Sequence, residues 1–133
     1  MNQARDDKAA AARLRMAELA AKFLERSRRD LEVMRDTLAK LAAGESAALG
    51  DIRQLAHRLC GTGATLGFET LGECAARVER LAEPGPAGTL PDRGTFTRLG
   101  ACIEALAGEL ALSTRLTSGR REHDFETPWR RLG

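Results

Sequence analysis

Residues 47–66 read AALGDIRQLAHRLCGTGATL, and their spacing predicts the helix around which the fold is built. On a helical wheel with about 100° per residue, apolar and small side chains gather within about 60° of one direction. This segment is therefore expected to be an amphipathic helix that ends at Gly67. The residues on its buried face are Ile52, Leu55, Ala56, Leu59, Gly63 and Leu66.

His57 does not belong to that buried face. It lies about 140° from the buried direction, so its imidazole is expected to face solvent. Gly61 lies at about 180° and Ala64 at about 120°, so the neighbours of the histidine have almost no side chain. A glycine inside a helix costs about 0.5–1 kcal/mol relative to alanine. Packing against the core suits Gly63, whereas Gly61 on the outer face indicates a surface that another protein approaches closely.

Apolar residues recur at helical spacing before this segment as well. Residues 9–43 carry two apolar sets that are separated by a wholly polar stretch, 25–30, and we expect two helices there. Gly44 is the expected stop of the second of these helices, and Ser46 is the expected N-cap of the next one. Residues 1–8 are polar and are expected to be frayed.

The chain after Gly67 predicts two more helices. Residues 69–81 are amphipathic, and residues 83–94 are rich in proline and glycine, which is typical of a loop. Asp92 or Thr95 is the expected cap of a last helix. The inward residues of that helix would be Phe96, Leu99, Ile103, Leu106 and Leu110.

These segments predict an all-α protein, an antiparallel four-helix bundle with an additional N-terminal helix. The bundle is expected over residues 9–113, after a polar N-terminal segment at 1–8. Periodicity stops near Ser113, and residues 114–133 are expected to be a polar C-terminal tail.

Composition narrows the class of protein. The chain has 133 residues, which is the length of one domain, and its net charge is +2 from 21 basic and 19 acidic side chains. This near-balance leaves no excess of positive charge of the kind that binds nucleic acid or an anionic membrane surface. The cysteines Cys60, Cys74 and Cys102 are odd in number and widely spaced, which favours reduced thiols. With no apolar run of membrane-spanning length, a cytoplasmic location is expected.

The segment Leu55–Phe68, LAHRLCGTGATLGF, resembles the signature of histidine phosphotransfer (HPt) domains. That signature has an Ala-His pair, a leucine two residues after the histidine, a glycine four after it and a closing Leu-Gly pair. The likeness extends over about residues 20–110 and is strongest in 55–81. It implies the HPt four-helix bundle with a preceding helix. It also makes His57 the phosphoryl acceptor and Gly61 the residue that gives clearance.

One position departs from the family pattern. The lysine that usually stands three residues after the histidine, where it would help to hold the phosphoryl group, is Cys60 here. Arg53 and Arg58 are not clean substitutes, because Arg53 leans away from His57 and Arg58 points about 100° aside. The surface that we expect to bind a partner around the histidine comprises Arg53, Gln54, Arg58, Cys60, Gly61 and Ala64.

The resemblance implies a phosphocarrier and not an enzyme. His57 would accept a phosphoryl group from the aspartyl phosphate of a receiver domain and pass it to another one in a two-component phosphorelay. The implied partners are receiver domains of response regulators or a hybrid histidine kinase. We expect a monomer with no nucleotide site, no cofactor and no metal.

Four other functions compete with this interpretation. A phosphate-binding glycine loop at 61–67 would have to follow a strand, and a helix precedes it. A zinc site at His57 and Cys60 lacks a second ligand pair. A catalytic Cys–His pair lacks an orienting acid. The strongest alternative is a helical adaptor or inhibitor that binds a receiver or kinase without being phosphorylated, and the missing lysine is the feature in its favour.

Overall fold

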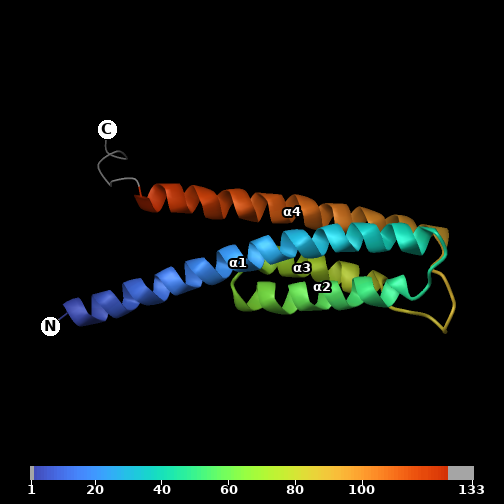
Figure 1. Ribbon diagram of the computed structural model, residues 1–133, viewed down its shortest axis with the longest axis horizontal. Coiled ribbons are helices and arrows are strands. Elements are labelled where there is room, and N and C mark those ends of the chain that lie inside the picture. Colours follow the sequence, from blue (N-terminus) through green and yellow to red (C-terminus); the bar gives the residue numbers. More distant parts are fainter. Residues whose placement is uncertain (1, 126–133) are drawn as a thin grey trace.

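The computed structural model describes the backbone of residues 2–125 and the side chains of residues 2–117. Helices run up and down in chain order and form an antiparallel bundle, with no strand in the described part of the chain (Figure 1). This arrangement confirms the all-α, four-helix prediction. The helices are α1 (Gln3–Ala42), α2 (Ala48–Thr65), α3 (Glu69–Leu81) and α4 (Arg93–Phe125).

α1 is one continuous helix, and the predicted additional N-terminal helix is wrong. Gln3–Ala42 contains neither glycine nor proline and is rich in alanine, leucine, arginine and glutamate, all strong helix formers. The polar stretch at 25–30 does not interrupt the buried stripe, because the small side chain of Ser27 is itself buried in it. The prediction of a frayed segment at 1–8 is also wrong, since helix begins at Gln3.

Two glycines end helices as predicted. Gly44 (φ +100°) and Gly67 (φ +86°) both adopt the left-handed conformation that favours glycine. After α2, the amide of Phe68 donates to the carbonyl of Gly63 at 2.8 Å, which closes the last turn. Ser46 is not the N-cap of α2, however. Ala47 takes that position without a side-chain cap, because the helix starts one residue later than the serine would require.

Asp92 caps α4, and it is one of the two residues that were predicted for this cap. Its Oδ1 accepts a hydrogen bond of 2.7 Å from the amide of Thr95, and this bond lowers the pKa of the Asp92 carboxyl. α4 continues to Phe125, so the first part of the predicted polar C-terminal tail is helical. Among the described side chains of α4, Ser113 is the last buried one. Residues 126–133 of the predicted tail lie outside the described residues.

The core is formed by one apolar stripe from each helix. α1 contacts α2 and α4, and α3 contacts the same two helices, so the four helices form a square in cross-section. Arg35 on α1 donates hydrogen bonds of 3.0 and 2.8 Å to both carboxylate oxygens of Glu104 on α4, which fixes the register of these two helices. The largest fully buried apolar side chains are Met34, Ile52, Leu71, Val78, Leu99, Ile103 and Leu106.

α2 and α3 approach each other most closely at two glycines. A Cβ atom on Gly63 would lie 3.5 Å from the ring of Phe23 and 3.7 Å from the Cα of Gly72. A Cβ on Gly72 would lie 3.4 Å from the carbonyl oxygen of Cys60. Phe23 closes the end of this contact by stacking on Phe68, with 5.5 Å between ring centroids. At this spacing of α2 and α3, each position has room for no more than about a methyl group.

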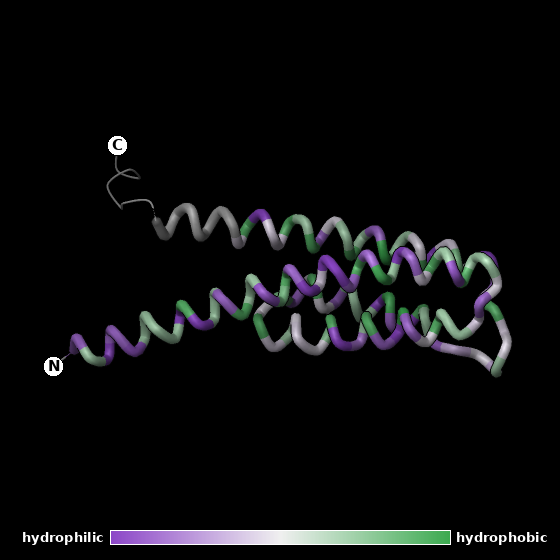
Figure 2. Tube along the Cα trace, in the orientation of Figure 1, coloured by the Kyte–Doolittle hydropathy of each residue, from purple (hydrophilic) through white to green (hydrophobic). Residues whose placement is uncertain are grey.

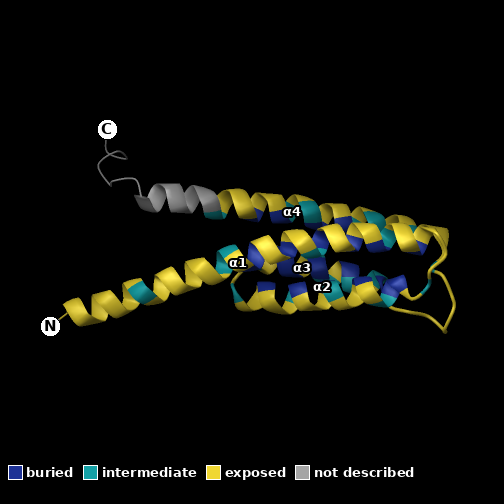
Figure 3. Cartoon of the chain, in the orientation of Figure 1, coloured by how far each residue is buried: buried dark blue, intermediate teal, exposed yellow. Residues whose placement is uncertain are grey.

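The N-terminal part of α1 extends beyond the bundle (Figure 1, Figure 3). Residues 12–19 are all exposed, and burial on α1 begins at Phe23. Hydrophilic and hydrophobic residues alternate along this extension, which includes the exposed Leu14, Met16 and Leu19 (Figure 2). Within the described residues, no helix combines the length and the hydropathy needed to cross a membrane.

Gly63→Leu should lower the free energy of unfolding by about 1–3 kcal/mol, because the new side chain has to displace Phe23 or separate α2 from α3. The matched control is Gly50→Leu on the same helix, where a Cβ meets nothing within 4 Å. Gly50→Leu should be neutral or should stabilise the helix by up to about 1 kcal/mol. Urea denaturation of both variants measures the difference, and equal effects would contradict the close approach.

Candidate functional site

His57 stands on the outer face of α2. Its side chain is 73% exposed, whereas its neighbours Ala56 and Leu59 are buried in the core. This outward position agrees with the helical wheel. The rigid part of the bundle thus carries an imidazole that a large molecule can reach.

Glu79 of α3 holds this imidazole by one hydrogen bond. Its Oε1 lies 2.7 Å from Nδ1 of His57, and the Glu79 side chain is only 24% exposed. An ionised carboxylate can only accept hydrogen bonds, so Nδ1 is the donor. The other ring nitrogen, Nε2, then carries the free lone pair in the neutral ring. The contact both orients the ring and selects its nucleophilic atom.

The sequence analysis did not identify Glu79 as a partner of His57. The pairing could have been found by counting residues from the short turn between the antiparallel helices α2 and α3. Gly63 and Gly72 face each other across that turn, and His57 precedes Gly63 by six residues while Glu79 follows Gly72 by seven. These separations differ by only one residue, so the two side chains come to nearly the same height in the antiparallel pair.

The surface next to His57 is open. Gly61 is exposed, and a Cβ atom there would meet nothing within 4 Å. Ala64, one turn further on, is exposed as well. These small residues leave space for another backbone beside the imidazole.

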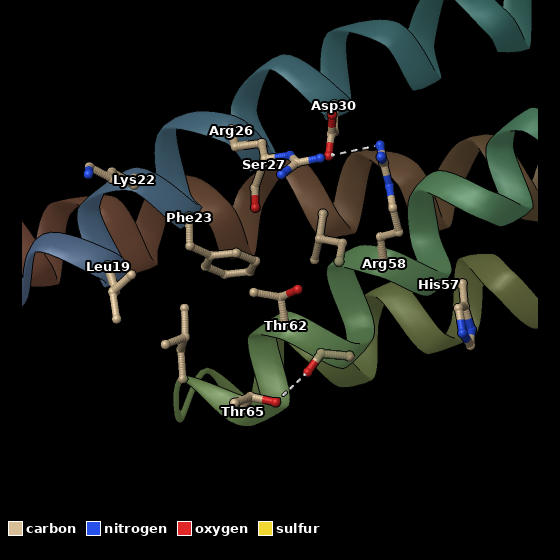
Figure 4. A pocket seen from close by; sticks show the side chains of 13 residues that line it. Leu19, Lys22, Phe23, Arg26, Ser27, Asp30, His57, Arg58, Thr62 and Thr65 are labelled. Carbon is tan, nitrogen blue, oxygen red and sulfur yellow. Dashed lines mark hydrogen bonds and ion pairs between the residues drawn. The ribbon is translucent and has the colours of Figure 1, made fainter. Parts of the chain in front are cut away.

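Two pockets between α1 and α2 adjoin the histidine, and both are lined by His57 and Arg58. The first, of about 580 Å³, lies toward the C-terminal end of α2 and has an apolar floor (Figure 4). Its floor and rim include Leu19, Lys22, Phe23, Arg26, Leu59 and Leu66. The second, of about 810 Å³, lies toward the N-terminal end of α2 and is more polar. Its other lining residues include Thr37, Lys40, Asp51, Arg53, Gln54 and Glu79.

The predicted binding residues divide between these pockets. Arg53 and Gln54 line the second pocket and Gly61 lines the first, whereas Cys60 and Ala64 line neither. Cys60 is half-buried and packs against the core at the α2–α3 contact. Arg58 points toward α1, where its Nη2 lies 3.8 Å from Oδ2 of Asp30, a partner that the sequence analysis did not identify.

In the described part of the chain, charged side chains form ion pairs and no metal-binding cluster. No group of three or more His, Cys, Asp and Glu side chains in this part of the chain is placed to hold a metal ion. Cys74, also half-buried, has its thiol pKa raised, mainly by burial. The chemistry that the described site offers is therefore that of an oriented imidazole between carboxylates and guanidinium groups.

The profile of the Hpt domain family matches residues 18–109, more than half of the chain. The chain belongs to the Hpt domain family. Members of this family act as phosphocarriers in two-component phosphorelays. The match begins in the extension of α1 and ends within α4, so it includes all of α2 and α3 and parts of α1 and α4 of this Hpt domain. Comparisons with curated proteins and with solved structures found no match.

Glu79→Ala should change the tautomer of His57 in this Hpt domain. Without an acceptor at Nδ1, part of the neutral ring population should move its proton to Nε2. Glu79→Gln is the matched control, because its side-chain carbonyl can still accept from Nδ1–H. The ¹⁵N shifts of the imidazole at a pH of about 8 distinguish the tautomers. A wild-type ring protonated mainly at Nε2 would contradict the geometry.

Proposed function

We propose that this protein carries a phosphoryl group on Nε2 of His57 between receiver domains of a two-component phosphorelay. The observation that carries the proposal is the hydrogen bond between Nδ1 of His57 and Glu79, which leaves Nε2 as the exposed nucleophile. It acts in the cytoplasm as a monomeric phosphocarrier without a nucleotide site. Its partners are receivers of response regulators or of a hybrid histidine kinase.

The chemistry requires one bond exchange. The lone pair of Nε2 attacks the phosphorus of an aspartyl phosphate, an N–P bond forms, and the P–O bond to the aspartate carboxylate breaks. The proton on Nδ1 stays in the hydrogen bond to Glu79, whose negative charge stabilises the positive charge that develops on the ring. Transfer to a second receiver is the reverse reaction.

The Hpt domain contributes position more than reactivity. Phosphoryl transfer depends mainly on alignment and on charge stabilisation, and a receiver would supply the metal ion and the acidic pocket. His57 is held on a helix whose opposite face is fixed in the core by Ile52, Ala56 and Leu59. The nucleophile therefore reaches the receiver already oriented.

The first pocket is the proposed docking surface. Its floor, which includes Leu19, Phe23 and Leu59, begins beside His57 and offers apolar area to a partner. Gly61 and Thr62 border it with small side chains, so a receiver backbone can approach the imidazole. The basic side chains of Lys22 and Arg26 suit a partner with acidic residues at the edge of its contact surface.

A second candidate function is binding without phosphorylation. The half-buried Cys60 in place of the family's lysine favours it, because a thiol contributes no positive charge to a phosphoryl group. In that case the same surface would bind a receiver or a kinase as an adaptor or inhibitor. Phosphorylation of His57 separates the two functions.

His57→Gln should abolish acid-labile phosphorylation and leave the fold intact, because the side chain is 73% exposed. The protein is incubated with a panel of receiver domains labelled with acetyl phosphate, and the labelled protein is tested for acid lability. Circular dichroism melting serves as the folding control. Label that persists on the variant would place the acceptor elsewhere, and a wild-type protein that takes no label from any receiver would favour the adaptor.

Gly61→Gln should slow transfer from a phosphorylated receiver by about tenfold or more, equal to about 1.4 kcal/mol of docking or transition-state free energy. The new side chain projects into the space beside His57, while the bundle has room for it. Ala105→Gln, at an exposed position on α4, is the matched control and should transfer at the wild-type rate. Equal rates for both variants would show that the receiver docks on another face.

A further inference from the structure

The site has a nucleophile, His57, but it lacks a positive charge at the position of the family's lysine. A phosphoryl group carries close to two negative charges, and the thiol of Cys60 has no positive charge to offset them. The basic side chains that line a pocket together with His57 are Lys22, Arg26, Lys40, Arg53 and Arg58. Arg58 is the one among them that lines both pockets, and it directly follows His57 in the chain.

Arg58 is held only weakly in its present position. Its side chain is 54% exposed, and the 3.8 Å between Nη2 and Asp30 Oδ2 exceeds hydrogen-bonding distance. Figure 4 shows Arg58 extended toward Asp30 on α1 while His57 points away from that helix. A contact of this length from an exposed guanidinium contributes little to stability, so Arg58 can leave Asp30 easily.

We infer that Arg58 exchanges partners when His57 is phosphorylated, leaving Asp30 to bind the phosphoryl oxygens. This inference rests on the proposed function. The phosphoryl group has about twice the charge of the Asp30 carboxylate, and a guanidinium binds it through two parallel hydrogen bonds. Arg58 is thus a phosphoryl-binding residue that replaces the family's lysine from a different position on α2.

Asp30 has a role of its own in this exchange. Its side chain is 18% exposed, so it loses a partner in partly buried surroundings when Arg58 moves. Asp30 therefore competes with the phosphoryl group for Arg58. This competition keeps the phosphohistidine from becoming so stable that the group is no longer passed on.

The experiment uses phosphoramidate as the phosphoryl donor, so that no receiver is needed. Nε2 displaces ammonia from phosphorus, and the ratio of phosphoramidate to ammonium in the buffer fixes the equilibrium. The phosphorylated fraction of the full-length chain gives an equilibrium constant for each variant. The variants are Arg58→Ala, Asp30→Asn, Arg115→Ala on the exposed face of α4 as the matched control, and Arg58→Ala combined with Cys60→Lys.

Arg58→Ala should lower the equilibrium constant by about three- to tenfold, the effect of losing one partly screened charge-assisted contact. Asp30→Asn should raise it by about two- to threefold, since Arg58 is then free. Arg115→Ala should stay within about twofold of wild type. Cys60→Lys should restore most of the loss in the Arg58→Ala background, because a lysine there leans toward His57.

A second readout excludes a purely structural effect. The ¹H–¹⁵N signal of the Arg58 Nε–H should shift when His57 is phosphorylated, and melting curves should show that every variant is folded. Equal constants for Arg58→Ala and Arg115→Ala, or an Arg58 signal that does not move, would overturn the exchange. A wild-type chain that takes no phosphoryl group would instead refute the proposed function itself.

Discussion

α2 and α3 pack closely at Gly63 and Gly72, where a single methyl group would already reach van der Waals contact and a larger side chain would have to displace its neighbours. This approach sets the height of one helix against the other, and the height brings Glu79 to the imidazole of His57. The orientation of the ring and the nitrogen that keeps a free lone pair both follow from this pairing. A packing constraint in the interior thus determines chemistry on the surface.

Much of the fold could be predicted from the sequence, because periodicity and capping residues act locally. The bounds of α2 and α3, the turns at Gly44 and Gly67, the cap at Asp92 and the outward position of His57 were expected on those grounds. The continuity of α1 was missed because residues 25–30 look polar throughout, although Ser27 is small enough to be buried. The length of α4 was missed because the apolar stripe that indicated the helix ends near Ser113, whereas the helix itself continues to Phe125.

The site was harder to predict, because its important pairs join different helices. The wheel of α2 places His57 and Arg58 correctly, yet it contains no information about Glu79 on α3 or Asp30 on α1. These partners depend on register and on the crossing of helices, which tertiary packing decides. His57 and Arg58 each have an acidic partner on a neighbouring helix. The two pairs differ in strength, with a hydrogen bond of 2.7 Å for the histidine and a looser contact of 3.8 Å for the arginine.

The square arrangement of the helices has a consequence for how the chain folds. Three of the four helix contacts join elements that follow one another in sequence, and only the α1–α4 contact joins the first element to the last. Contacts between sequence neighbours close short loops and form rapidly. The seam between α1 and α4, with the ion pair of Arg35 and Glu104, requires the longest loop closure. We expect this seam to form last during folding. The amide hydrogens of α1 and α4 along the seam should therefore exchange with solvent faster than those of the α2–α3 hairpin.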